Sequence, residues 1–183
     1  MNSIEKRRND RSTVYVKRGL QPHPEPAWLR EQGTVLNRIH AALAAPDALA
    51  HRNHLAVEVL KEIEGGNRAV YLTPIVNGFS LEEYMEDPAT YAGRFPVEDL
   101  DTMKRDLGKA MFWLSQQGFV HGDAKPENIM FDEDHRRLVL IDFEIAGNVN
   151  DAALNRDFLA LENACADIEW LHTPPIDPAS VAL

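Results

Sequence analysis

The chain lacks several features that mark specialised classes of protein. Its 183 residues include one cysteine, Cys165, so an internal disulfide and a disulfide-stabilised small fold are excluded. No apolar run approaches the roughly 20 residues that a membrane-spanning helix needs, and the longest strong one covers only residues 138–141. The polar first 13 residues do not have the apolar core of a signal peptide. We therefore expect no membrane span.

Basic residues are also few. The 19 Lys and Arg residues face 29 Asp and Glu residues, which gives a net charge of −10. A chain this acidic is a poor match to the phosphate backbone of nucleic acids, so we expect no nucleic-acid partner. Its hydrophobic share of 44% is typical of a globular protein with a true core.

The apolar pattern predicts one domain of mixed helices and strands. We expect this domain to cover residues 13–172, between a flexible leader at 1–12 and a tail at 173–183. The pattern predicts strands at 13–17, 56–63, 68–74, 129–131 and 138–141, and helices from Pro26 to Pro46, after Ser80, from Pro96 to Gly118 and over 154–171.

The most informative stretch is HGDAKPENIMFDEDHRRLVLIDFE, residues 121–144. A loop presents Asp123, Lys125 and Asn128, and a predicted hairpin returns the chain to Asp142. Phosphoryl transfer needs this combination: a carboxylate to orient the attacking hydroxyl, a cation for the phosphate, and oxygen ligands for magnesium. The pattern therefore favours phosphoryl transfer.

This stretch resembles two motifs of the protein-kinase family. It matches the catalytic loop H-x-D-x-K-P-x-N and, fourteen residues after Asn128, the D-F-G motif, which here reads Asp142-Phe143-Glu144. The resemblance implies that Asp123 orients the substrate hydroxyl and Lys125 contacts the γ-phosphate of ATP. It also implies that Asn128 and Asp142 bind Mg²⁺.

The resemblance extends to the nucleotide site with less specific motifs. It implies that Lys17, paired with Glu31 of the first helix, aligns the α- and β-phosphates, and that the backbone of Ile75, Val76 and Asn77 binds adenine. Two further positions would support the catalytic loop: His121, through its backbone contacts and Phe143, and Asp157, from the final helix.

The sequence departs from the kinase pattern in four places. No glycine-rich loop precedes Lys17, so we expect the first hairpin over ATP to be missing or rudimentary. Gly122 replaces the arginine that docks a phosphorylated activation loop, Glu144 replaces the last glycine of D-F-G, and no A-P-E motif follows. We therefore expect an α+β, minimal two-lobed kinase-like fold, with residues 13–76 as a truncated N-lobe and 77–172 as a truncated helical C-lobe.

Three functions follow from these observations. The first is a serine/threonine protein kinase that uses Mg-ATP, similar to the short kinases that pathogenic bacteria inject into host cells. This function implies a protein substrate, an activating protein partner, and a location in the cytoplasm or in the host cell. The second is a small-molecule phosphotransferase similar to aminoglycoside or lipopolysaccharide-core kinases, which commonly carry HGD and DFE variants. The third is a nucleotide-binding pseudokinase adaptor.

Overall fold

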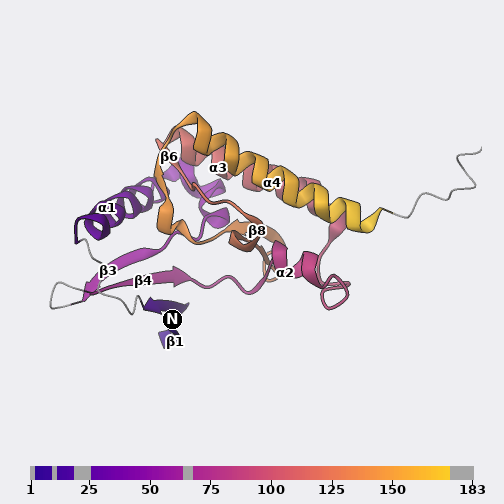
Figure 1. The fold of residues 1–183 in the computed structure, drawn as a ribbon, viewed down its shortest axis with the longest axis horizontal. Coiled ribbons are helices and arrows are strands. Elements are labelled where there is room, and N and C mark those ends of the chain that lie inside the picture. The colour runs from indigo at the N-terminus through magenta and orange to yellow at the C-terminus, as the bar shows by residue number, and fades with distance from the viewer. Residues whose placement is uncertain (1–2, 10–11, 19–25, 64–67, 174–183) are drawn as a thin grey trace, which may run out of the picture.

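The computed structural model describes residues 3–9, 12–18, 26–63 and 68–173 (Figure 1). Helices and small antiparallel sheets share the chain, as expected for an α+β fold. The strands are β1 (Ser3–Asn9), β2 (Ser12–Arg18), β3 (Val59–Ile63), β4 (Arg68–Pro74), β5 (Gly78–Ser80), β6 (Phe119–Val120), β7 (Ile129–Asp132), β8 (Arg137–Leu140) and β9 (Gly147–Asn148). The α-helices are α1 (Pro26–Leu43), α2 (Leu81–Glu86), α3 (Leu100–Gln116) and α4 (Asp151–His172).

The first sheet has the strand order β1-β2-β4-β3, and all of its pairs are antiparallel. Helix α1 packs beside it, nearest β3 (Figure 1). The prediction of a leader over residues 1–12 was wrong for residues 3–9, which form β1 and pair with β2. Of the two expected forms of the first hairpin, missing or rudimentary, the first is wrong for the same reason. An edge strand is held by backbone hydrogen bonds and tolerates charged side chains such as those of this segment, so its polar sequence concealed it.

The predicted helices are confirmed, and their ends have local causes. At the start of α2, the hydroxyl of Ser80 accepts the amide of Glu83, while the Glu83 carboxylate accepts the amide of Ser80. The side chain of Asn150 caps α4 in the same way, by accepting the amide of Ala153. Gly118, just past α3, has a φ of 90°, which suits a glycine that ends a helix.

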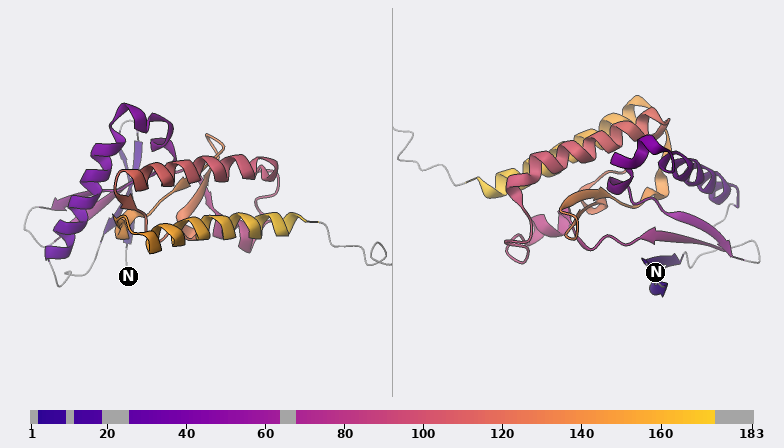
Figure 2. Two further views of the ribbon diagram at one scale, coloured as in Figure 1. Left: turned by 90° about the horizontal axis from the view of Figure 1, so that it is seen from above. Right: turned by 180° about the vertical axis from the view of Figure 1, so that it is seen from behind.

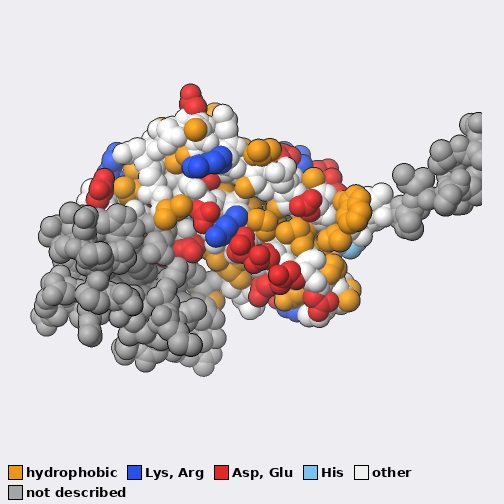
Figure 3. Space-filling view, viewed as in Figure 1, with side chains coloured by type: hydrophobic (Ala, Val, Ile, Leu, Met, Phe, Trp, Pro, Cys, Tyr) orange, Lys and Arg blue, Asp and Glu red, His pale blue; other side chains and the backbone are white. Residues whose placement is uncertain are grey.

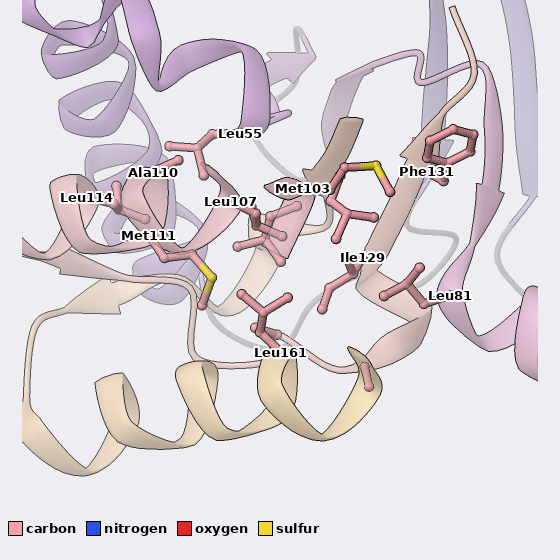
Figure 4. Close-up of a cluster of buried hydrophobic side chains, with 14 of the residues drawn as sticks. Leu55, Leu81, Met103, Leu107, Ala110, Met111, Leu114, Ile129, Phe131 and Leu161 are labelled. Atoms are coloured by element: carbon pink, nitrogen blue, oxygen red, sulfur yellow. The ribbon is translucent and has the colours of Figure 1, made fainter. Parts of the chain in front are cut away.

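We call the expected N-lobe (13–76) and C-lobe (77–172) the first and the second lobe. The core of the second lobe lies between α3, α4 and the hairpin β7–β8. Helices α3 and α4 run side by side (Figure 2), and their apolar faces meet strand residues across the core. Figure 4 shows the side chains that meet there, among them Leu107 of α3, Leu161 of α4 and Ile129 of β7. This core fixes the ends of β6 and β7, and the loop of residues 121–128 joins those two strands. None of the helices in the described ranges is long and apolar enough to cross a membrane.

The segment between α1 and β3 packs against the second lobe instead of the first sheet. Leu55 forms a parallel bridge with Leu140 of β8, and the amide of Ala56 donates to the Leu140 carbonyl at 2.9 Å. The side chain of Leu55 is part of the core drawn in Figure 4. The chain therefore enters β3 directly beside the strand that leads to Asp142.

Candidate active site

The loop between β6 and β7 brings Asp123, Lys125 and Asn128 together. The Lys125 ammonium lies 3.3 Å from Oδ2 of Asp123, and this hydrogen bond raises the pKa of Lys125, which keeps it cationic. The side-chain nitrogen of Asn128 donates to the backbone oxygen of Asp123 at 2.9 Å and to Oδ2 at 3.2 Å. Asn128 is buried, whereas Asp123 and Lys125 are partly exposed, so a carboxylate and a cation face solvent together.

The hairpin β7–β8 places Asp142 beside this loop, as the sequence predicts. Ile129 pairs with Leu140 at its open end, and one step further the amide of Ile141 donates to the Asn128 carbonyl at 2.9 Å. Asp142 is the next residue. Asn128 and Asp142 are fourteen residues apart in sequence, but the hairpin brings their backbones side by side.

The side chains of Asn128 and Asp142 suit a magnesium ion. With its nitrogen committed to Asp123, the Asn128 amide offers its oxygen, and Asp142 offers a carboxylate. In nucleotide enzymes, Mg²⁺ is held by one or two protein oxygens together with phosphate oxygens and water. No group of three His, Cys, Asp or Glu side chains in metal-binding geometry occurs among the residues that the structure describes. One amide oxygen and one carboxylate match the one or two protein ligands of such an ion.

Asp142 has an unusual backbone conformation. Its φ of 62° and ψ of 64° lie in the left-handed region, which costs about 1–2 kcal/mol for most residues and is tolerated best by glycine, Asn and Asp. The following residues, Phe143–Ile145, form a single 3-10 turn, with the side chain of Phe143 fully buried. The surroundings must hold this conformation in place.

His121 is a structural part of the loop, as predicted. Its Nε2 lies 2.8 Å from the Ile141 carbonyl, its Nδ1 accepts the Asp123 amide at 3.2 Å, and its ring packs edge-on against Phe143. An Nδ1 that accepts a hydrogen bond belongs to a neutral imidazole. Burial also lowers the pKa of His121, so the neutral ring is the stable form.

The neutral state of His121 predicts a pH dependence of stability. Below its ordinary pKa near 6.5, the unfolded chain protonates this side chain and the folded chain does not. The free energy of unfolding must then fall as the pH drops through that value. His121→Asn cannot titrate, so denaturant unfolding at about pH 7 and about pH 5 should show a smaller loss than in the wild type. Equal losses in both proteins would contradict this assignment.

Asp157 of α4 supports the loop from beneath, as predicted. Its carboxylate is buried and accepts the amide of Gly122 at 2.8 Å and the amide of Ala124 at 3.3 Å. These amides flank Asp123, so one side chain of a long helix fixes the backbone on both sides of the candidate catalytic carboxylate.

The backbone conformation and surroundings of Gly122 favour glycine at this position. Its φ is 86°, and a Cβ at this position would lie 3.3 Å from the carbonyl of Ile145. We expect Gly122→Ala to lower the free energy of unfolding by about 1–2 kcal/mol because of the left-handed conformation. The control is Gly108→Ala in α3, where the new Cβ would make only an ordinary contact and helix propensity should raise stability by about 0.5–1 kcal/mol. A neutral Gly122→Ala variant in urea unfolding would contradict the prediction.

The predicted Lys17–Glu31 pair stays a prediction. Lys17 lies in β2, opposite Tyr71 of β4, but its side chain is outside the described residues, as is that of Glu144. Glu31 is exposed on α1. The neighbouring Gln32 is buried and donates to the carbonyls of Phe143 at 3.1 Å and Ala146 at 3.4 Å. The sequence did not predict the role of Gln32, because a single glutamine in a helix does not indicate a buried contact.

A second residue that the sequence analysis missed is Glu58. Its carboxylate is buried and accepts the amide of Phe143 at 2.8 Å. The available signal was its place in the sequence: Glu58 is the one charged residue in the apolar run of residues 55–60. A carboxylate inside such a run needs polar partners.

The expected adenine-binding segment connects β4 to β5. Ile75 and Val76 are half-buried, and Asn77 is exposed. The carbonyl of Asn77 accepts the amide of Glu133 at 2.9 Å, and its side chain donates to Asp134 at 3.1 Å. These bonds tie the segment to the turn of the β7–β8 hairpin, and its adenine contacts stay a prediction.

The surface next to Lys125 is acidic. Partial burial and the neighbouring carboxylates of Glu127 and Glu86 raise the pKa of Glu82, and helix α2 packs against the turn at Pro126–Asn128 that follows Lys125. Figure 3 shows one face of the molecule, with acidic side chains beside basic ones near its middle. The Lys125 ammonium therefore lies beside a negatively charged surface.

Comparison with known proteins finds one matching family model and several partial relatives. The model of the phosphotransferase enzyme family matches residues 9–149. A probable serine/threonine-protein kinase of Dictyostelium discoideum, fnkB, is 34% identical over 71 residues, which are 39% of this chain and 13% of that protein. The maternal embryonic leucine zipper kinase of Danio rerio is 28% identical over 114 residues, 62% of this chain and 16% of that protein. The chain thus spans less than a fifth of these relatives.

Two solved kinase structures have a similar fold. The BubR1 kinase domain superposes with a TM-score of 0.58 at 18% identity, covering 82% of this chain and 46% of that chain. The Cydia pomonella granulovirus kinase PK-1 gives a TM-score of 0.54 at 16% identity, with 80% and 48% covered. These likenesses confirm the expected two-lobed α+β fold.

Proposed function

The chain belongs to the phosphotransferase enzyme family, and from that premise we propose that it transfers the γ-phosphate of ATP to a serine or threonine hydroxyl of a protein. The observation that carries the proposal is that the side chains of Asp123, Lys125 and Asn128 contact one another. The backbone bond from Ile141 to Asn128 brings Asp142 beside them. The partial serine/threonine-kinase relatives support a protein acceptor.

Each side chain of the site has a task in the proposed reaction. Asp123 accepts a hydrogen bond from the acceptor hydroxyl and aligns its oxygen with the γ-phosphate. Lys125, whose ammonium lies 3.3 Å from Asp123, contacts the same phosphate and stabilises the negative charge that builds on its oxygens. Asn128 and Asp142 hold Mg²⁺, which supplies charge neutralisation to the ATP phosphates.

The nucleotide-binding part of the proposal depends on the first lobe. Lys17 of β2 and Glu31 of α1 align the α- and β-phosphates, and the backbone at residues 75–77 receives adenine. The sheet β1-β2-β4-β3 supplies the strand that carries Lys17. Lys17→Ala should weaken ATP binding and leave the unfolding of the second lobe unchanged.

A small-molecule acceptor is the second candidate, and the HGD and DFE variants at residues 121–123 and 142–144 favour it. The acidic surface around Glu82, Glu86 and Glu127 suits a cationic acceptor of either kind, because opposite charges attract in the encounter. Arginine-rich peptides and aminoglycosides are therefore the acceptors to compare.

The test is transfer of radiolabelled γ-phosphate from Mg-ATP, with Asp142→Asn alongside. Proteins of a eukaryotic cell lysate, arginine-rich peptides and aminoglycosides are offered separately. Label in a few proteins or in the peptides that disappears with Asp142→Asn supports the proposal. Label only in the small molecules moves the function to the second candidate. If ATP binds but no acceptor is labelled, the chain is an adaptor instead.

A further inference from the structure

The backbone of Phe143, next to Asp142, is held from both sides by side chains outside the kinase-like motifs. Glu58 accepts its amide at 2.8 Å, and Gln32 donates to its carbonyl at 3.1 Å. Both side chains are buried, with 4% and 7% of their surface exposed. The two contacts come from different elements, Gln32 from α1 and Glu58 from the residue before β3.

Glu58 ends a ladder that runs beside β8. His54 contacts the Leu138 carbonyl through Nδ1 at 2.8 Å, the amide of Ala56 donates to the Leu140 carbonyl at 2.9 Å, and the Glu58 carboxylate then receives the Phe143 amide. Every second residue of 54–58 thus contacts the β8 segment, and the last contact, at Phe143, lies beyond the end of β8. The Glu58 carbonyl is bound in turn by Nε2 of His40, on α1, at 3.0 Å.

We propose that Glu58 and Gln32 are positioning residues that hold Asp142 in the conformation that binds magnesium. Asp142 has a left-handed backbone, which its neighbours must stabilise. Glu58 and Gln32 fix the peptide groups that follow it, so the direction of the Asp142 carboxylate is set before any ligand arrives. This inference rests on the proposed function, because it takes Asp142 as a metal ligand.

The proposal also assigns a link between the lobes. Gln32 bonds to the carbonyls of Phe143 and Ala146, so a shift of α1 would release one side of the Asp142 segment. Glu58 would keep the other side in place, because its ladder belongs to the second lobe. Losing Gln32 should therefore loosen the segment less than losing Glu58.

The experiment uses the full chain and compares Glu58→Ala, Glu58→Gln and Gln32→Ala with the wild type. The glutamine in Glu58→Gln keeps an oxygen that can accept the Phe143 amide, so it should rescue. Glu98→Ala and Gln116→Ala are matched controls, because they make the same chemical changes at exposed side chains. Circular dichroism checks that each variant is folded.

The first readout is hydrogen exchange of residues 141–147 without metal or nucleotide. We expect faster exchange there in Glu58→Ala and, to a smaller extent, in Gln32→Ala, with α3 unchanged. The second readout is the Mg²⁺ concentration that half-maximally tightens binding of a non-hydrolysable ATP analogue. It should rise about 10- to 100-fold in Glu58→Ala, the usual effect of removing a residue that orients a metal ligand.

Unchanged exchange in Glu58→Ala and Gln32→Ala overturns the inference, and so does faster exchange with an unchanged magnesium requirement. If Glu58→Ala does not fold, Gln32→Ala decides by the same two readouts. A wild type that binds the analogue equally with and without Mg²⁺ overturns the proposed function instead. Hydrogen exchange is measured without ligands, so it tests the roles of Glu58 and Gln32 even if the proposed function is wrong.

Discussion

Replacing Asp123 by Asn is expected to lower the rate of phosphoryl transfer by about 100- to 10,000-fold, the range found for a side chain that accepts a proton or orients the nucleophile. The Asn amide has the same shape as the Asp carboxylate, but it has no negative charge with which to orient the acceptor hydroxyl. Its oxygen can still accept the Asn128 nitrogen, which also bonds to the Asp123 backbone, so the loop should keep its fold. The effect should therefore fall on turnover and not on nucleotide binding.

The measurement is single-turnover transfer from saturating Mg-ATP to an acceptor identified with the wild type. The matched control is Asp101→Asn, which makes the same chemical change on an exposed part of α3 and should react at the wild-type rate. A rate for Asp123→Asn within a few-fold of the wild type would show that another group orients the acceptor.

Replacing Asp157 by Ala is expected to lower the free energy of unfolding by about 3 kcal/mol or more and to abolish transfer. A hydrogen bond to a charged group contributes about 1.5–3 kcal/mol, and this carboxylate accepts two amides of the loop. The amides of Gly122 and Ala124 would lose their hydrogen-bond acceptor, and little water could replace it. The backbone around Asp123 would lose its support. Stability and activity should fall together.

Urea unfolding with Asp157→Ala, Asp157→Asn and Asp167→Ala tests this prediction. Asn keeps one acceptor oxygen, which can serve the 2.8 Å bond from Gly122, so its loss should be intermediate. Asp167 is exposed on the same helix, and its loss should be close to zero. If Asp157→Ala unfolds at the same urea concentration as Asp167→Ala, Asp157 does not support the loop energetically.

The parts of the fold that the sequence predicted are those with strong local signals. The capping box at Ser80, the apolar period of α3 and the two apolar runs around residues 129–140 each specify their element from nearby residues. The candidate catalytic loop was predictable because its polar residues follow a short, fixed spacing. Asp157 was found through resemblance, since its position on α4 is distinguished from other acidic residues only by the family pattern.

The missed parts depend on backbone pairing and on partners far away in the chain. Strand β1 has a charged sequence, and its pairing with β2 is a matter of backbone bonds that side-chain pattern does not report. Gln32 and Glu58 act on a peptide group more than 80 residues away in the chain. Local propensity carries no information on such partners, although the charge of Glu58 within an apolar run signals that a partner exists.

The central claim is that residues 121–144 form a centre for a magnesium nucleotide, and magnesium-dependent nucleotide binding tests it without knowledge of the acceptor. A non-hydrolysable ATP analogue is titrated by calorimetry, with and without Mg²⁺, into the wild type, Asp123→Asn and Asp142→Asn. Asn tolerates the left-handed conformation of residue 142, so this variant removes the charge and keeps the backbone. Mg²⁺ should tighten binding in the wild type and Asp123→Asn but not in Asp142→Asn. Equal tightening in all three proteins would contradict the central claim.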